Sequence, residues 1–234
     1  MKVRLMFMMV GTIILISSPW NSVDAQSKQA TKVEVATEVL TEIMAIPEKG
    51  IPPSMLRNAY GVAVIPSVLK ASFVVGGRYG WGILAVRSKE AGWSSPCFVS
   101  LAGGSVGYQI GAQSTDVILV FKSRRSIDGI MRGKYTLGAD AAVAAGPVGR
   151  QAGAATDVEL KAEIYSYSRS RGLFAGVSFE GAALQIDHDS NVAFYGKQDI
   201  TPGDIFAGRG IEVPARTNEF KQVLTKYTTA EKKN

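Results

Sequence analysis

The chain has 234 residues, and its 26 lysines and arginines outnumber its 20 aspartates and glutamates, which gives a net charge of +6. Because the basic residues are dispersed, the composition argues against a nucleic-acid-binding domain, which carries a concentrated basic stripe. The only histidine is His188 and the only cysteine is Cys97, which excludes an internal disulfide and most zinc chemistry. We therefore expect no nucleic-acid partner, no metal and no cofactor.

Residues 1–25 have the layout of a secretory signal peptide. A basic start with Lys2 and Arg4 is followed by an apolar stretch from Leu5 to Ile16 and by a small-residue site at 23–25. The apolar stretch is too short to cross a bilayer as a helix, and a retained membrane anchor is the alternative. We predict an exported protein of the periplasm or cell envelope, peripheral rather than transmembrane. Residues 26–228 would form a single domain and residues 229–234 a frayed tail.

An amino-terminal helix is predicted over residues 30–46, where apolar residues recur at helical spacing: Val33, Ala36, Leu40, Ile43 and Met44. Its polar face carries Glu34, Glu38 and Glu42 besides lysines, whereas a helix lying in a membrane interface usually presents lysine and arginine there. We therefore favour a helix docked on the protein's own core over a membrane-surface helix. A second, short helix is expected to begin at Pro52–Pro53.

Four runs rich in β-branched, aromatic and glycine residues predict the core of the fold. They are residues 60–66, ended by Pro66, then 71–88, 96–114 and 115–123. Glycines inside them indicate bulges or strong bends, because glycine weakens a flat strand. We expect a sheet core over residues 60–187, strongly twisted, mostly antiparallel and curled toward a barrel. The fold class is therefore α+β, with helices at both ends of the chain and short helices between strands.

The second half of the chain alternates short elements. We expect a brief helix over 124–133, one strand and a glycine-lined loop within 135–157, and strands over 159–170 and 172–187. A short helix over 188–196 and a turn at 201–206 precede an amphipathic carboxyl-terminal helix over 214–228.

The segment from Ile164 to Arg171 alternates with period two, which is typical of a strand. Ile164 and three serines point one way, and the other face presents two phenols and two guanidiniums, those of Tyr165, Tyr167, Arg169 and Arg171. Apolar, strand-forming residues flank the segment on both sides, unlike a disordered arginine–serine arm. This face meets either an anionic ligand or neighbouring carboxylates.

One catalytic pattern is formally present. Gly103 to Gly107 reads G-x-S-x-G around Ser105, and His188 follows later in the chain, in the order found in α/β-hydrolases. That motif requires a strand, a sharp turn and a helix, which lift the serine onto the helix start. Here the residues after Gly107 continue as a strand. We therefore expect no enzyme, and a serine hydrolase is only a remote alternative.

Two arginines stand in settings that suit an anion. Arg78 lies in a glycine-rich bend between Tyr79 and Trp81, and Arg150 ends a turn whose backbone N–H groups could cradle a phosphate. If sheet curvature brings them near Arg169, guanidinium groups would provide bidentate recognition. The structural alternative is ion pairing with Asp140, Asp157 or Glu180.

Four segments in order, 61–84, 92–121, 137–150 and 164–196, resemble the SYLF lipid-binding domain, also called the Ysc-type actin-binding domain. The resemblance covers most of residues 26–228 and identifies the chain as an exported bacterial member. It implies an α+β domain that binds lipids, with phosphoinositides and in some cases actin as ligands of eukaryotic members. It also indicates Lys70 and Arg78 as the first positions to test.

The leading hypothesis is a non-catalytic envelope protein that binds anionic phospholipid, in the way the family binds phosphoinositide-like headgroups. The lipid-binding residues we predict are Lys70, Arg78, Arg150, Tyr167, Arg169 and Arg171. An envelope structural or protein-interaction module without a lipid ligand is the alternative. Because the chain carries an export signal and shows no SH3 module, we expect actin to be an unlikely partner.

Overall fold

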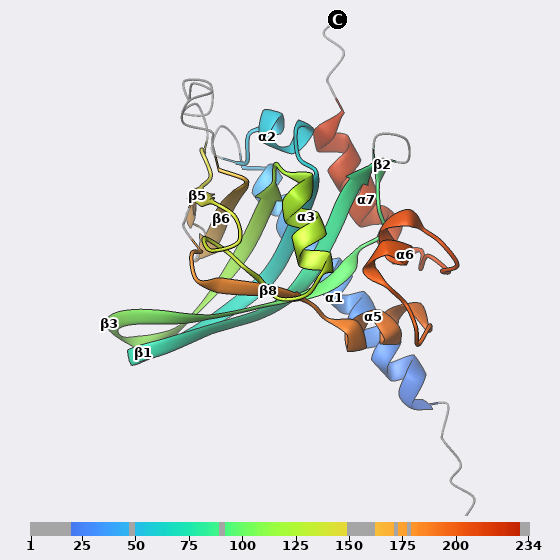
Figure 1. Ribbon diagram of the computed structural model, residues 1–234, viewed down its shortest axis with the longest axis horizontal. Helices are drawn as coiled ribbons and strands as arrows, with labels where there is room; N and C mark the ends of the chain where they lie inside the picture. The colour runs from blue at the N-terminus through green and yellow to red at the C-terminus, as the bar shows by residue number, and fades with distance from the viewer. Residues whose placement is uncertain are drawn as a thin grey trace, which may run out of the picture.

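The computed structural model describes residues 20–46, 50–88, 92–148, 162–170, 173–176 and 179–229, with the backbone alone for 20–25, 71–75 and 105–112 (Figure 1). The first half contains α1 (Trp20–Met44), α2 (Pro53–Arg57), β1 (Gly61–Ser88), β2 (Gly92–Trp93), β3 (Cys97–Phe121) and α3 (Arg124–Met131). The second half contains β4 (Tyr135–Thr136), β5 (Val143–Ala145), β6 (Ile164–Ser170), β7 (Leu173–Gly176), β8 (Ala182–Ile186), α5 (His188–Tyr195), α6 (Pro202–Ala207) and α7 (Arg216–Thr228).

The fold is α+β, as predicted, and its sheet is organised around one long pair of strands. β1 and β3 pair antiparallel from Gly61 opposite Phe121 to Leu84 opposite Cys97. The end of β3 pairs with β6, and its start pairs with β8, which continues to β4. β6 pairs with β7 antiparallel and with β5 in parallel, so the sheet is mixed. The result is a curled half-barrel.

The four predicted strand runs are in fact two strands. β1 continues past Pro66 because the ladder shifts its register between Ile65 and Val68, and a bulge is one of the few places where a strand tolerates proline. Ser67 at this bulge has a φ of 51°, and its N–H donates to Asp116 Oδ1 at 3.0 Å. The bulge therefore bends β1 instead of ending it.

Two other predictions are corrected by local geometry. The single strand expected over 172–187 divides into β7 and β8, because Gly181 turns the chain with a φ of 77°. The turn expected at 201–206 is the short helix α6. Its first turn is closed by a capping box, in which Thr201 accepts from the Asp204 N–H and the Asp204 side chain accepts from the Thr201 N–H.

The β1–β3 pair runs out to a tip at one end of the molecule and back, as the teal and green ribbons of Figure 1 show. We call this projecting part, residues 68–82 of β1 and 100–115 of β3, the arm. At its base β1 doubles back on itself, so that a Cβ on Gly82 would lie 2.1 Å from the Val64 carbonyl oxygen, and one on Gly80 would lie 2.8 Å from Val68 Cγ2. Only glycine permits this close approach of backbone to backbone.

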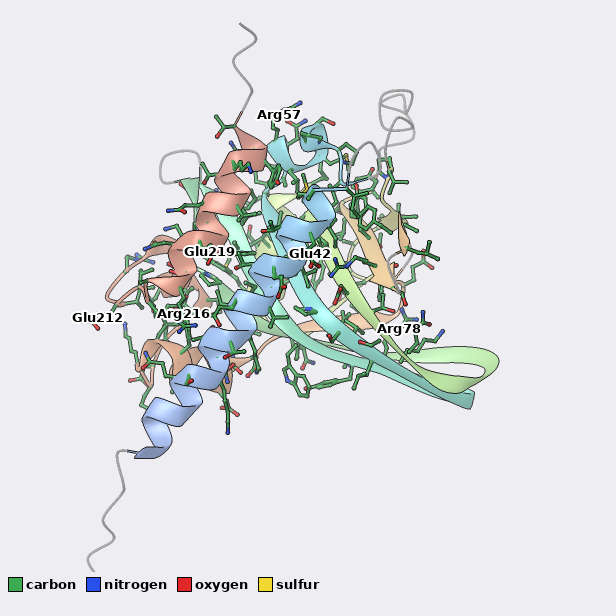
Figure 2. The ribbon with its side chains drawn as sticks, turned by 180° about the vertical axis from the view of Figure 1, so that it is seen from behind. Glu42, Arg57, Arg78, Glu212, Arg216 and Glu219 are labelled. Atoms are coloured by element: carbon green, nitrogen blue, oxygen red, sulfur yellow. The ribbon has the colours of Figure 1, made fainter. Side chains whose placement is uncertain are left out.

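Two hydrophobic clusters lie on the two faces of the sheet. The first joins α1, α2, α5 and α7 to β1, β3 and β6, and the second joins α3 and β4 to the opposite face of the same strands. In Figure 1 α3 lies in front of the sheet, and in Figure 2, which views the molecule from the other side, α1 crosses in front of the sheet. α1 buries Val33, Leu40 and Ile43 completely, so it is docked on the core, as its acidic polar face indicated.

Cys97 is buried at the start of β3, where Asn191 Nδ2 donates to its sulfur at 3.5 Å. Burial raises the pKa of its thiol from 9.0 to about 12.

We expect the Cys97 thiol of the folded protein to resist a thiol reagent at mildly alkaline pH and that of the denatured protein to react fully, because only the thiolate attacks. Since the folded pKa exceeds the unfolded one, this thiol's contribution to stability is present below pH 9 and is lost as the pH rises toward 12. Rapid labelling of the native protein would contradict the burial.

Candidate functional site on the arm

Three large apolar side chains are exposed on one face of the arm. Leu69, Tyr79 and Trp81 have exposed fractions of 59%, 42% and 47%. The rings of Tyr79 and Trp81 meet edge to face with centroids 4.4 Å apart. This contact restrains both side chains although they are exposed to solvent. Ile83 belongs to the hydrophobic cluster that α1 covers and Val68 to the other cluster. Strand alternation therefore places Tyr79, Trp81 and Leu69 on the α1 side of the sheet. We call Leu69, Tyr79 and Trp81 the apolar patch.

A cation from another element lies against this patch. Lys32 of α1 places its Nζ 5.7 Å from the centre of the Trp81 ring. This is a cation–π contact, worth about 0.5–1 kcal/mol where it is exposed. It leaves a positive charge beside exposed aromatic surface.

Lys70 and Arg78, the first positions indicated by the family resemblance, both lie on the arm, on the face opposite the patch. Arg78 is half-buried, its guanidinium lies 5.1 Å from the centre of the Phe179 ring, and burial lowers its pKa. Its buried Nε has no hydrogen-bond partner in the part of the chain that the structure describes. Figure 2 shows Arg78 along the arm, well away from Arg57. The arm therefore carries cations on both faces.

The other predicted site residues do not join this group. Tyr167 is completely buried and stacks on Phe174 with ring centroids 5.6 Å apart, so its ring is not available at the surface. Arg150 and Arg171 lie outside the described residues. The alternation predicted for β6 holds, because Ile164 belongs to one hydrophobic cluster while Tyr165 and Tyr167 belong to the other.

Arg169 forms ion pairs with two carboxylates. Among the described residues its partners are Asp116 and Glu42, and not Asp140 or Glu180 as the ion-pairing alternative proposed; Asp157 lies outside the described residues. Its Nη2 lies 2.9 Å from Asp116 Oδ2 on β3, and its Nη1 donates to Glu42 on α1. Figure 2 shows Glu42 on the carboxyl-terminal half of α1, where the helix crosses the sheet. A second ion pair, Arg216 to Glu34, joins α7 to α1. The acidic face of α1 thus faces basic residues of its own fold.

We expect replacement of Arg169 by methionine to destabilise the protein by about 1–3 kcal/mol, because Asp116 is mostly buried and would lose its main partner. Glu42→Gln should cost less than about 1 kcal/mol, since Glu42 is half exposed. Denaturant unfolding of both variants measures the difference. Equal losses would mean that the exposed pair, not the Asp116 pair, is the important one.

The structure lacks the context that a serine hydrolase needs. β3 runs as a strand through Gly103–Gly107 to Phe121, with no helix after Ser105. Ile186 of β8 pairs with Val99, six residues before Ser105, which amounts to about 20 Å along the strand, and His188 lies beyond Ile186 in the other direction. The serine-hydrolase alternative is therefore wrong.

Lys32, Leu69 and the partners of Arg169 are not predictable from the sequence alone. Tyr79 and Trp81 are sequence neighbours of Arg78, and strand alternation already places both rings on the face of the strand opposite to Arg78. No local pattern could have linked Lys32 to Trp81, because only the docking of α1 brings them together.

No helix among the described residues is long and apolar enough to cross a membrane.

These features define a helix-covered, half-barrel α+β domain with a projecting two-stranded arm. The family described as "Ysc84: Las17-binding protein actin regulator" matches residues 102–227. The chain belongs to this Ysc84 (SYLF) family, which is known for lipid-binding and actin-binding domains, as the sequence indicated.

Named relatives agree with this assignment. The SH3 domain-containing YSC84-like protein 1 of Xenopus laevis is 36% identical over 199 residues, 82% of this chain and 59% of its own length. Protein YSC84 of Saccharomyces cerevisiae is 34% identical over 206 residues, 87% of this chain and 43% of its own length. The rat YSC84-like protein 1 is 34% identical over 211 residues, 89% and 60% respectively. The chain thus spans about three fifths or less of the length of these relatives.

Proposed function

We propose that this protein binds the surface of anionic phospholipid membranes through the arm. The observation that carries the proposal is the apolar patch, whose rings and leucine are exposed on a part of the molecule that projects from the body. Tryptophan and tyrosine are favoured at the boundary between headgroups and acyl chains, since one end of each ring system is apolar and the other polar.

The charges around the patch favour anionic lipid over neutral lipid. Lys32 lies beside Trp81 on the face that carries the patch, whereas Lys70 and Arg78 lie on the opposite face of the arm. A basic residue near an anionic leaflet contributes about 1 kcal/mol. The charge of Lys32 and a shallow apolar contact give reversible, salt-sensitive binding, the behaviour of a peripheral protein.

α1 is not the contacting element in this arrangement. Its apolar stripe is buried, and each large apolar side chain on that stripe contributes about 1.5–3 kcal/mol to docking. Exposing Val33, Leu40 and Ile43 together would cost more free energy than exposed ion pairs or a few headgroup contacts could contribute to binding. A membrane contact through the arm requires no such release.

The proposal includes export to the cell envelope, which is inferred from the signal-peptide layout of residues 1–25. Detection of the protein, cleaved after residue 25, in a periplasmic or envelope fraction would support it. Full-length protein confined to the cytosol would contradict it.

Vesicle co-sedimentation of the purified protein tests lipid binding. We expect binding to vesicles of phosphatidylcholine with phosphatidylglycerol, little binding to phosphatidylcholine alone, and loss of binding as salt is raised. Absence of binding to both vesicle types at low salt would overturn the proposal.

Actin regulation is the second candidate, favoured by the description of the family as actin regulators and by relatives such as protein YSC84. Co-sedimentation with actin filaments, in the same buffer and without lipid, distinguishes it. Filament binding without vesicle binding would replace the lipid proposal with this one.

A further inference from the structure

A second basic site lies at the other end of β1 from the arm. A pocket of about 440 Å³ is lined by residues 57–60, which follow α2, by Arg87 and Ser88 at the end of β1, and by Gly92. Arg87 is nine residues beyond Arg78, about 30 Å along the strand. Figure 2 shows Arg57 at one end of the molecule and Arg78 on the arm. The pocket and the apolar patch are therefore separate sites.

Arg87 is held in place before any ligand arrives. Its guanidinium lies 6.0 Å from the centre of the Trp93 ring, and its Nη1 donates to the Arg57 carbonyl oxygen at 2.6 Å. Trp93 is itself buried and fixed, because its Nε1 donates to Thr228 Oγ1 at 3.1 Å. The Arg87 N–H also donates to the Tyr60 carbonyl at 2.8 Å. Little side-chain entropy is left to lose on binding.

The lining residues that the structure describes are basic. They include two arginines, Arg57 and Arg87, and no carboxylate, while Lys89 and Glu90 between Ser88 and Gly92 lie outside the described residues. The carbonyl oxygen of Arg57 at the end of α2 would repel an anion, but it already accepts a hydrogen bond from the Arg87 guanidinium. Arg87 has further N–H donors besides the one used, and Asn58 and Tyr60 add an amide and a phenol to the lining.

We propose that this pocket binds a phosphate monoester group, either on a small soluble molecule or on a lipid headgroup. A monoester carries close to two negative charges near neutral pH, which matches the two guanidiniums. Guanidinium forks bind phosphate oxygens in pairs, and the volume falls in the range of small-ligand sites. The inference goes beyond membrane docking by the arm and does not depend on it.

The test titrates the full chain with inorganic phosphate and with glycerol 3-phosphate, followed by calorimetry or ³¹P NMR. We expect saturable binding that Arg57→Gln and Arg87→Lys each weaken by about ten-fold or more, since a charge-assisted pair is lost or its fork removed. Arg132→Gln, which removes an exposed arginine at the end of α3, should leave the affinity unchanged. Because Arg87 packs on Trp93, Arg57→Gln serves as the variant that spares the fold.

Vesicles distinguish the two sources of the phosphate. Phosphatidic acid presents a monoester and phosphatidylglycerol a diester, so a headgroup site predicts preference for phosphatidic acid that Arg57→Gln abolishes. Binding of the soluble monoesters without that preference assigns the site to a soluble ligand. If neither form binds in an Arg57-dependent way, or if Arg132→Gln weakens binding equally, the proposal is overturned, whatever the outcome for the arm.

Discussion

Replacing both Tyr79 and Trp81 by serine is expected to weaken binding to phosphatidylglycerol vesicles by between ten- and one-hundred-fold. Each ring is nearly half exposed and would place about 100 Å² of apolar surface in the interface, which is worth roughly 2 kcal/mol. Because 1.4 kcal/mol corresponds to about ten-fold and the two rings touch, the losses are not expected to add fully. Vesicle titration by co-sedimentation measures the change.

The control for this experiment is an exposed apolar residue away from the arm. Met131 at the end of α3 is 36% exposed, and Met131→Ser should leave vesicle binding unchanged. Both variants should remain folded, since the replaced side chains lie at the surface. Equal vesicle binding by the wild type and the Tyr79/Trp81 double variant would remove the arm from the lipid interface.

Replacing Gly82 by alanine is expected to lower the free energy of unfolding by about 3 kcal/mol or more. The added methyl group would lie 2.1 Å from the Val64 carbonyl oxygen and 2.7 Å from the Ile65 Cα, and both of these atoms are backbone. A flexible side chain could move aside, but here the doubling of β1 would have to open. Denaturant unfolding measures the loss.

Gly104 on β3 provides the matched comparison. A methyl group there meets nothing within 4 Å, and the backbone is extended, so Gly104→Ala should be neutral or stabilise by up to about 1 kcal/mol. Similar effects of Gly82→Ala and Gly104→Ala would show that β1 does not pack against itself as described.

Elements with a clear period were predictable from the sequence, and those decided by a single turn were not. The strand at Ile164–Ser170 and the helix at Arg216–Thr228 follow from alternation and helical spacing, both of which are local. The division between β7 and β8 depends on the positive φ of Gly181, and α6 depends on a capping box, and both signals are only a few residues long.

The candidate site was predicted in part for the same reason. Lys70 and Arg78 lie on the arm, but the patch on the opposite face depends on which part of β1 the helices leave uncovered. Glu42, which is 127 residues away in sequence, was not predicted as a partner of Arg169, because the chain contains many carboxylates with which an arginine could pair. Charge alone does not select among them.

The sequence by itself determined the family, the α+β class, the docked character of α1 and the alternation of β6. These depend on patterns within one segment, where burial of apolar side chains fixes which face turns inward. Only the tertiary structure decided that Lys32 meets Trp81, that Arg169 joins β3 to α1, and that Arg57 and Arg87 share a pocket. Each of these is a contact between segments far apart in the chain, and it exists only because the long β1–β3 pair folds back and the helices pack across it.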